Sequence, residues 1–167
     1  MRFRLEANGH LIISGVGGVE LEFLRQVPGI SRSEDPRAKA RIYSVPGSEP
    51  DLMEDWEEFV RPDLEEHFSG ALEVIESDLA RVKHGKNGSQ IEVVPDHWES
   101  WLIGLNQARL TLWAEHLFTD SEMAEEEPIA DPARSAAFFA MNLYGFLQEV
   151  LLRLLEKMGD EEETTEE

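Results

Sequence analysis

The sequence predicts a mainly helical α+β fold, with a small N-terminal antiparallel β-hairpin or sheet and two long, packed C-terminal helices. Three observations predict this fold. Alternating apolar and charged residues precede Asn8-Gly9 near the start of the chain, apolar residues recur every three to four positions through most of the remainder, and the two longest helical patterns lie at the C-terminal end.

The N-terminal hairpin is predicted by its turn as well as by its strands. Phe3 and Leu5 alternate with charged residues up to Asn8-Gly9, a dipeptide that favours the left-handed conformations of a tight turn, and residues 11–13 return as a second strand. Two strands alone are only marginally stable in water. We therefore expect the hairpin to lie on other elements, with residues 91–94 as a candidate third strand.

Short helical patterns fill the next part of the chain. Leu21, Leu24 and Val27 share one helical face, and we expect Pro28-Gly29 to end that helix. A capping acid followed by proline, Asp35-Pro36, predicts a short helix in the connection that follows. The remaining patterns predict a helix over 50–60, a kink or new start at Pro62, and an amphipathic helix over 63–83 that a glycine-rich segment ends at 84–88.

Two long helices close the domain, separated by a polar loop over residues 119–130. Asp96 is the expected cap of the first, and Asp131-Pro132 opens the second, which reaches about Met158. The second helix is apolar around much of its circumference, which is typical of a central helix surrounded by others. Residues 160–167 hold six acids in eight positions. We therefore expect one domain over residues 1–158 and a disordered acidic tail over 159–167.

Composition excludes several classes of function. The 167-residue chain has 35 acidic and 15 basic residues and a formal net charge of -20. Nucleic acids and anionic membranes bind dense basic surfaces, so we expect neither partner. The absence of cysteine excludes disulfides, thiolate zinc sites and cysteine nucleophiles. No uninterrupted apolar run reaches the length of a membrane span and the first residues lead into a strand, so we expect no signal peptide and a cytoplasmic protein.

The sequence carries no motif for a catalytic centre, a cofactor or a metal. Gly15-Val16-Gly17-Gly18 lies between a strand and a helix, but it lacks the third glycine of a dinucleotide fingerprint and the Lys-Ser/Thr of a phosphate loop. We interpret it as a tight turn. None of the five histidines forms a helical ligand pair. Asp63 and His67, four residues apart, predict a surface acid–histidine pair.

A polar cluster is predicted between the two long helices. Asn106 and Arg109 lie three apart in an otherwise apolar helix, and Gln148-Glu149 interrupts the apolar face of the last helix. A buried guanidinium needs a compensating partner. We expect Arg109 to pair with Glu149, with Asn106 and Tyr144 completing the network. Two interpretations stay open: a structural network that fixes helix register, or a polar pocket for an anionic ligand.

The same segments carry a resemblance to a known family. The chain resembles the bacterial domain-of-unknown-function family twenty-seventeen over most of residues 1–158, most closely in Trp101-Leu102…Leu105-Asn106…Arg109-Leu110 and in Tyr144-Gly145-Phe146-Leu147-Gln148-Glu149. The resemblance implies that Asn106, Arg109, Gln148 and Glu149 belong to the framework of the domain. It implies no activity for any residue.

We therefore expect a cytoplasmic protein–protein interaction or regulatory module without catalysis. The acidic body, the lack of catalytic motifs and the excess apolar surface of the last helix favour this function. The partner would be another protein, or a second copy bound through the last helix as a homodimer. The alternative is a small-molecule-binding protein or enzyme that holds an anionic ligand at the polar cluster.

Overall fold

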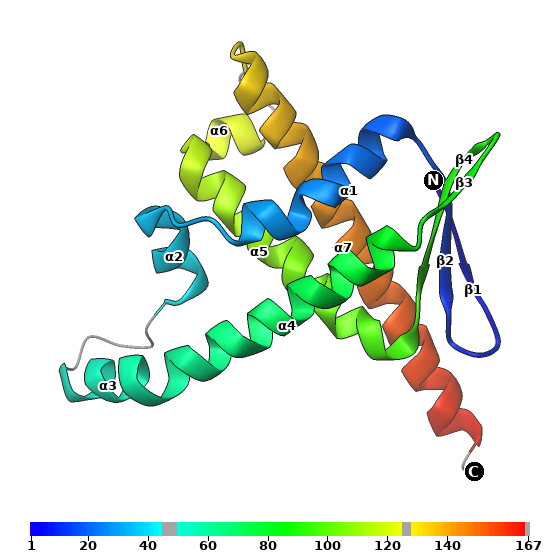
Figure 1. Ribbon diagram of the computed structural model, residues 1–167, viewed down its shortest axis with the longest axis horizontal. Helices are drawn as coiled ribbons and strands as arrows, with labels where there is room; N and C mark the ends of the chain where they lie inside the picture. The colour runs from blue at the N-terminus through cyan, green and yellow to red at the C-terminus, as the bar shows by residue number, and fades with distance from the viewer. Residues whose placement is uncertain (45–49, 125–127, 166–167) are drawn as a thin grey trace.

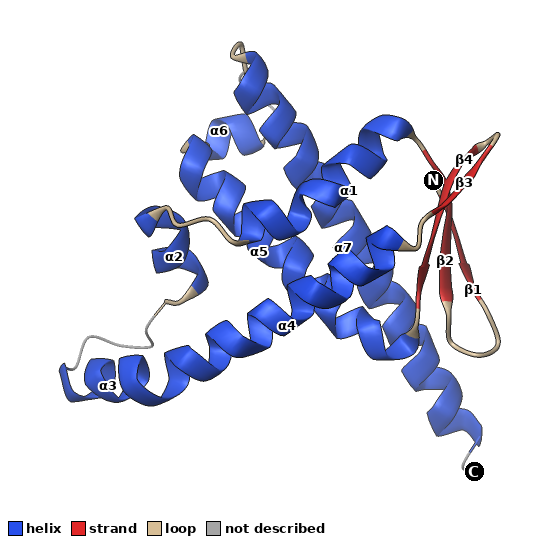
Figure 2. Ribbon diagram, in the orientation of Figure 1, coloured by secondary structure: helices blue, strands red, loops and turns tan. Residues whose placement is uncertain are grey.

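The computed structural model describes residues 1–44, 50–124 and 128–165 (Figure 1). Crossing helices form most of the molecule, and a small sheet stands at one side of them (Figure 2). The long helices α5 (Trp98–His116) and α7 (Pro132–Thr165) pack against each other. The predicted α+β fold class is confirmed, including the small antiparallel sheet and the two packed C-terminal helices.

The sheet has four antiparallel strands in the order β1-β2-β4-β3. The predicted hairpin is confirmed, because Phe3 of β1 faces Ile13 of β2 across a turn in which Gly9 has φ 78°. Ile13 in turn faces Ile91 of β4, so residues 91–93 of the candidate third strand do join the hairpin, a pairing that the sequence left open. The strands are β1 Arg2–Leu5, β2 Leu11–Val16, β3 Lys83–Gly85 and β4 Gly88–Val93.

Residues 84–88, which were expected only to end a helix, belong to a second hairpin. Residues 83–85 form β3, which turns back into β4 at Asn87-Gly88. Gly88 has φ 102°, and a Cβ atom built there would lie 2.9 Å from the backbone of Gly15. The hairpin therefore needs glycine at this position both for its backbone conformation and for its approach to β2.

The helices surround α5, which contacts α1, α2, α4 and α7. Its small residues allow this close packing: a Cβ atom on Gly104 would lie 2.3 Å from Ile75 Cδ1 of α4. The core includes Trp101, Leu105 and Tyr144, all almost fully buried. The helical elements are α1 Gly18–Ser31, α2 Pro36–Ile42, α3 Pro50–Asp55, a π-helical turn Trp56–Val60, α4 Arg61–Ala80, a 3-10 turn Pro95–His97, α5, α6 Asp120–Met123 and α7.

The predicted helix starts at prolines are confirmed, whereas one predicted stop is wrong. Asp35 caps α2 and Asp131 caps α7, each through its carboxylate and a backbone N–H, at 2.8 Å. Pro28 does not end α1, which continues to Ser31 with Pro28 buried inside it. Burial of the ring against the core outweighs the loss of one helical hydrogen bond. Asp96 lies in the 3-10 turn before α5 and makes no capping bond there.

The helix α6 was not predicted. Thr119 and Glu122 form a reciprocal capping box at its start. Glu122 also pairs with Arg134 of α7 at 2.7 Å, and Arg134 donates to the carbonyl of His116 at the end of α5. These contacts hold the pKa of Glu122 low, at about 2. The loop between the long helices is thus tied to both of them.

The last helix departs from expectation in three respects. By length and composition, residues 132–158 are long and apolar enough to cross a membrane, although no uninterrupted apolar run predicted this. One face of this helix, including Tyr144, Leu147 and Leu151, is buried. Only 33% of its apolar stretch is buried, so the expectation of a central helix surrounded by others is wrong, and α5 takes that place. The helix continues to Thr165, and residues 166–167 lie outside the described residues. The disorder of the 159–167 tail and the absence of membrane binding stay predictions.

Candidate functional site

The predicted cluster between the long helices exists with different partners. Arg109 Nη1 donates to Gln148 Oε1 at 2.7 Å, in place of the expected bond to Glu149. Gln148 Nε2 donates onward to the carbonyl of Leu102 at 3.1 Å, which ties α7 back to α5. Glu149 instead pairs with Arg153, one turn along its own helix. The expected Arg109–Glu149 pair is therefore wrong, because Gln148 is the member of the adjacent pair that meets α5.

The other two expected members lie outside the cluster. Asn106 is exposed on α5. Tyr144 is buried and donates from its hydroxyl to the carbonyl of Phe23 in α1, at 2.6 Å. Burial raises the pKa of Tyr144. Tyr144 thus joins α7 to α1, and only Arg109 and Gln148 of the expected set bond to each other.

An open hollow of about 500 Å³ lies over Arg109. Glu149 and Glu156 line it together with Arg153. Within the described residues, Arg109 Nε has no hydrogen-bond partner, while Nη1 is engaged by Gln148. The two carboxylates beside the guanidinium reduce its attraction for an anion. The geometry therefore fits a link between α5 and α7 better than a site for an anionic ligand.

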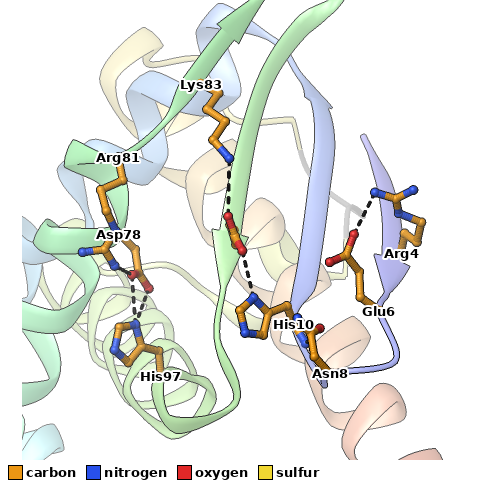
Figure 3. Close-up of polar contacts among 9 residues, drawn as sticks. Arg4, Glu6, Asn8, His10, Asp78, Arg81, Lys83 and His97 are labelled. Atoms are coloured by element: carbon orange, nitrogen blue, oxygen red, sulfur yellow. Dashed lines mark hydrogen bonds and ion pairs between the residues drawn. The ribbon is translucent and has the colours of Figure 1, made fainter.

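A second polar cluster, centred on Asp78, was not predicted. The Asp78 carboxylate is fully buried at the end of α4 and accepts from Trp101 Nε1 at 2.8 Å, from His97 Nδ1 at 2.9 Å and from Arg81 at 2.5 Å. Figure 3 shows His97 and Arg81 converging on it. Asp78 lies three residues after Ile75 on the apolar face of α4, and an acid at such a spacing is the signal that could have revealed it.

A third cluster joins β3, β4 and the turn that precedes β2. His10 Nδ1 lies 2.8 Å from a carboxylate oxygen of Glu92 in β4, and Lys83 of β3 approaches the same carboxylate at 3.5 Å (Figure 3). Hydrogen bonding from His10 and the charge of Lys83 hold the pKa of Glu92 below its usual value. The arrangement ties the β1–β2 turn to β3 and β4 at the surface.

The remaining sequence candidates are structural. Residues 15–18 form the end of β2 and the turn into α1, as interpreted from the sequence. His67 approaches Glu99 of α5 at 3.8 Å, rather than the expected Asp63. Among the described residues, no group of histidines and acids is arranged to hold a metal ion.

The largest departure from ordinary packing is the helical arm formed by α3 and the π-helical turn, residues 50–60. Figure 1 shows α3 at the far end of α4, on the opposite side of the molecule from the sheet. The sequence predicts that apolar residues share one face of this helix, but not whether that face is covered. The structure leaves large apolar side chains exposed on it by these fractions: Leu52 49%, Met53 45%, Phe59 61% and Val60 38%.

The comparisons with curated proteins and with solved structures found no match. The comparison with protein families found one, described as Domain of unknown function (DUF2017), whose model covers residues 14–155. This range holds α5, residues 132–155 of α7 and the clusters of Arg109 and Asp78. The chain therefore belongs to the DUF2017 family.

Proposed function

We propose that the protein is a cytoplasmic protein–protein interaction module without catalytic activity, and that it binds its partner through the arm of residues 50–60. The exposed apolar face of this arm carries the proposal. Its large side chains recur at the spacing of a helix that inserts one face into a groove. Leaving such side chains in water loses the free energy that their burial would gain, and a partner would recover it.

The charge of the arm indicates the chemistry of the partner. Glu54, Asp55, Glu57 and Glu58 are exposed around the apolar face, and of these Glu57 pairs with Arg61. A partner that covers the apolar face would therefore bring an apolar groove bordered by lysine or arginine. A second copy of the arm would bring like charges, so self-association through this surface is disfavoured.

The test compares capture of the partner by two surface variants of the full chain. A double variant, Leu52→Ser with Phe59→Ser, removes the apolar anchors from exposed positions and is expected to fold. Val19→Ser is the matched control, since Val19 is 63% exposed on α1. Tagged wild type and control are expected to capture the same stoichiometric protein from host lysate, and the double variant is expected to lose it.

Crosslinking tests whether the captured protein contacts the arm of residues 50–60. A photoreactive phenylalanine analogue at position 59 is expected to give a crosslinked product with the captured protein, and the same analogue at position 19 is expected to give none. Capture that survives both serine substitutions, with no crosslink from position 59, would contradict the proposed surface.

A homodimer through α7 is the second candidate, favoured by two exposed phenylalanines. Phe139 and Phe146 are each 47% exposed, two turns apart on α7. The ring centroid of Phe139 lies 5.3 Å from that of Phe23 in α1, and the ring centroid of Phe146 lies 5.8 Å from that of Phe3 in β1. Aromatic residues of α1, β1 and α7 therefore contribute to this surface. We expect Phe139→Ser with Phe146→Ser to dissociate such a dimer in sedimentation velocity. A wild-type protein that stays monomeric at high micromolar concentration would remove the homodimer and leave the arm proposal intact.

A further inference from the structure

A polar hollow lies on the side of α5 away from α7. It is bounded by the α1–α2 connection, α2, α4 and α5, and its volume is about 320 Å³. That volume is within the range of small-molecule sites in proteins. The hollow shares no lining residue with the arm, with the Arg109 hollow or with the aromatic surface of α7. It is therefore independent of the function proposed above.

The Gln107 side chain lines this hollow and is 4% exposed. Its Nε2 atom is buried and has no hydrogen-bond partner among the residues that the structure describes. A buried amide without a partner is costly, and such groups are rare in folded proteins. The hydroxyls of Ser31 and Ser33 also line the hollow and donate to the carbonyl of Gly104 and to Glu115, and neither accepts from this amide. The amide nitrogen is thus left without a partner in a side chain that lines the hollow.

The other walls indicate a flat and uncharged occupant. Tyr43 and Phe68 line the hollow and pack against each other, with ring centroids 5.8 Å apart and planes inclined by 34°, and Arg61 lies over the Tyr43 ring. A planar ligand would contact the parts of these rings that face the hollow. Two bases and two acids also line it, so their formal charges cancel. The bases already have partners, since Arg32 pairs with Glu76 and Lys39 with Glu34. This arrangement provides no free cation for a carboxylate or phosphate.

We propose that this hollow binds a small, neutral, planar nitrogen heterocycle with a hydrogen-bond donor next to an acceptor, the chemistry of a nucleobase. A glutamine amide presents a donor beside an acceptor, and this pair matches the edge of a base in a bidentate bond. Gln107 supplies that edge, Tyr43 and Phe68 supply the apolar surface, and the ring fills the space above the buried amide.

The experiment uses the full chain with adenine, uracil and nicotinamide as separate probes, each titrated and followed by chemical shifts in amide NMR spectra. Gln107→Leu replaces the amide side chain with an apolar side chain of similar size. Ser69→Trp fills the hollow from an exposed position on α4. Thr111→Val is the matched control, because Thr111 is fully buried on α5 and its hydroxyl also lacks a partner within the described residues, yet it does not line the hollow.

Wild type and Thr111→Val are expected to bind at least one probe saturably and with equal affinity. Gln107→Leu is expected to weaken that binding about tenfold or more, the effect of losing the bidentate pair of hydrogen bonds, and Ser69→Trp to abolish it. Thermal unfolding checks that each variant is folded, and Ser69→Trp keeps the test decisive should Gln107→Leu fail to fold. No saturable binding of any probe to wild type, or undiminished binding to folded Gln107→Leu, would overturn the proposal.

Discussion

Replacing Asp78 by alanine tests whether the buried carboxylate holds the end of α4 to the start of α5. The substitution leaves Trp101 Nε1 buried without its acceptor at 2.8 Å, at a cost of about 1–3 kcal/mol. It also removes the acceptor of His97 Nδ1 at 2.9 Å, a hydrogen bond to a charged group worth about 1.5–3 kcal/mol. The contact with Arg81 adds little, because that side chain is 59% exposed.

These contributions sum to about 2.5–6 kcal/mol. Removing one partner of a buried ion pair costs about 3–5 kcal/mol, which lies within that range, so we expect a loss of about 3–5 kcal/mol. For a chain of this length, the midpoint of thermal unfolding should fall by roughly 6–20 °C. Urea unfolding followed by tryptophan fluorescence and by circular dichroism measures the change in free energy of unfolding directly.

The matched control is Glu66→Ala, which removes an exposed acid from the same helix and should change stability by less than about 0.5 kcal/mol. Trp101→Phe combined with Asp78→Ala completes a double-mutant cycle and should give a coupling free energy of about 1 kcal/mol or more. An Asp78→Ala protein whose stability matches that of the control would refute the role assigned to this carboxylate.

Three further predictions concern packing, pH and the link between the long helices. Gly104→Ala should lower the free energy of unfolding by about 1–3 kcal/mol, since its new Cβ would lie 2.3 Å from a side-chain atom of α4. Gly70→Ala has open space around it and should raise the free energy of unfolding by about 0.5–1 kcal/mol. Urea titration of both variants distinguishes the steric clash from the general effect of replacing glycine by alanine in a helix. The pKa of Glu122 is lowered to about 2, first by its hydrogen bond from Arg134. Its contribution to stability is therefore present above the unfolded pKa near 4.5 and is lost as pH falls towards 2. Thermal scans from pH 6 to 2 should show a smaller loss of stability in acid for Glu122→Gln than for wild type, and identical profiles would contradict this. Gln148→Ala should cost about 1–3 kcal/mol in the same urea assay because it breaks two hydrogen bonds between α5 and α7, and a loss below about 0.5 kcal/mol would show that this link is dispensable.

Much of the fold could be predicted from local pattern, because the relevant signals act over a few residues. The capping acids Asp35 and Asp131 mark helix starts through bonds to their own neighbouring backbone, and alternation identifies the first strand of the first hairpin while Asn8-Gly9 identifies its turn. The end of α1 could not be predicted in this way. Pro28 is buried in the helix, so its position depends on tertiary contacts that the local proline rule does not include.

The candidate sites show the same boundary between local and tertiary information. Sequence brings Arg109 and the Gln148-Glu149 pair to facing helices, but adjacent residues point about 100° apart around a helix. Which of the two meets Arg109 depends on the rotation of α7, which sequence spacing does not fix. The shared apolar face of residues 50–60 was likewise predictable, whereas its exposure depends on the path of the whole chain around it.

The pairing of β2 with β4 has a consequence for the order of events during synthesis. Leu11 faces Val93 across these strands, so the centre of the sheet joins β2 to a strand that is made only after α1, α2, α3 and α4. Until that segment leaves the ribosome, β1 and β2 form an isolated hairpin, which is marginal in water. Closing so long a stretch of chain is entropically slow. The sheet therefore forms late, on a helical framework that α1 and α4 have begun to build, and the nascent chain carries its N-terminal strands unprotected until then.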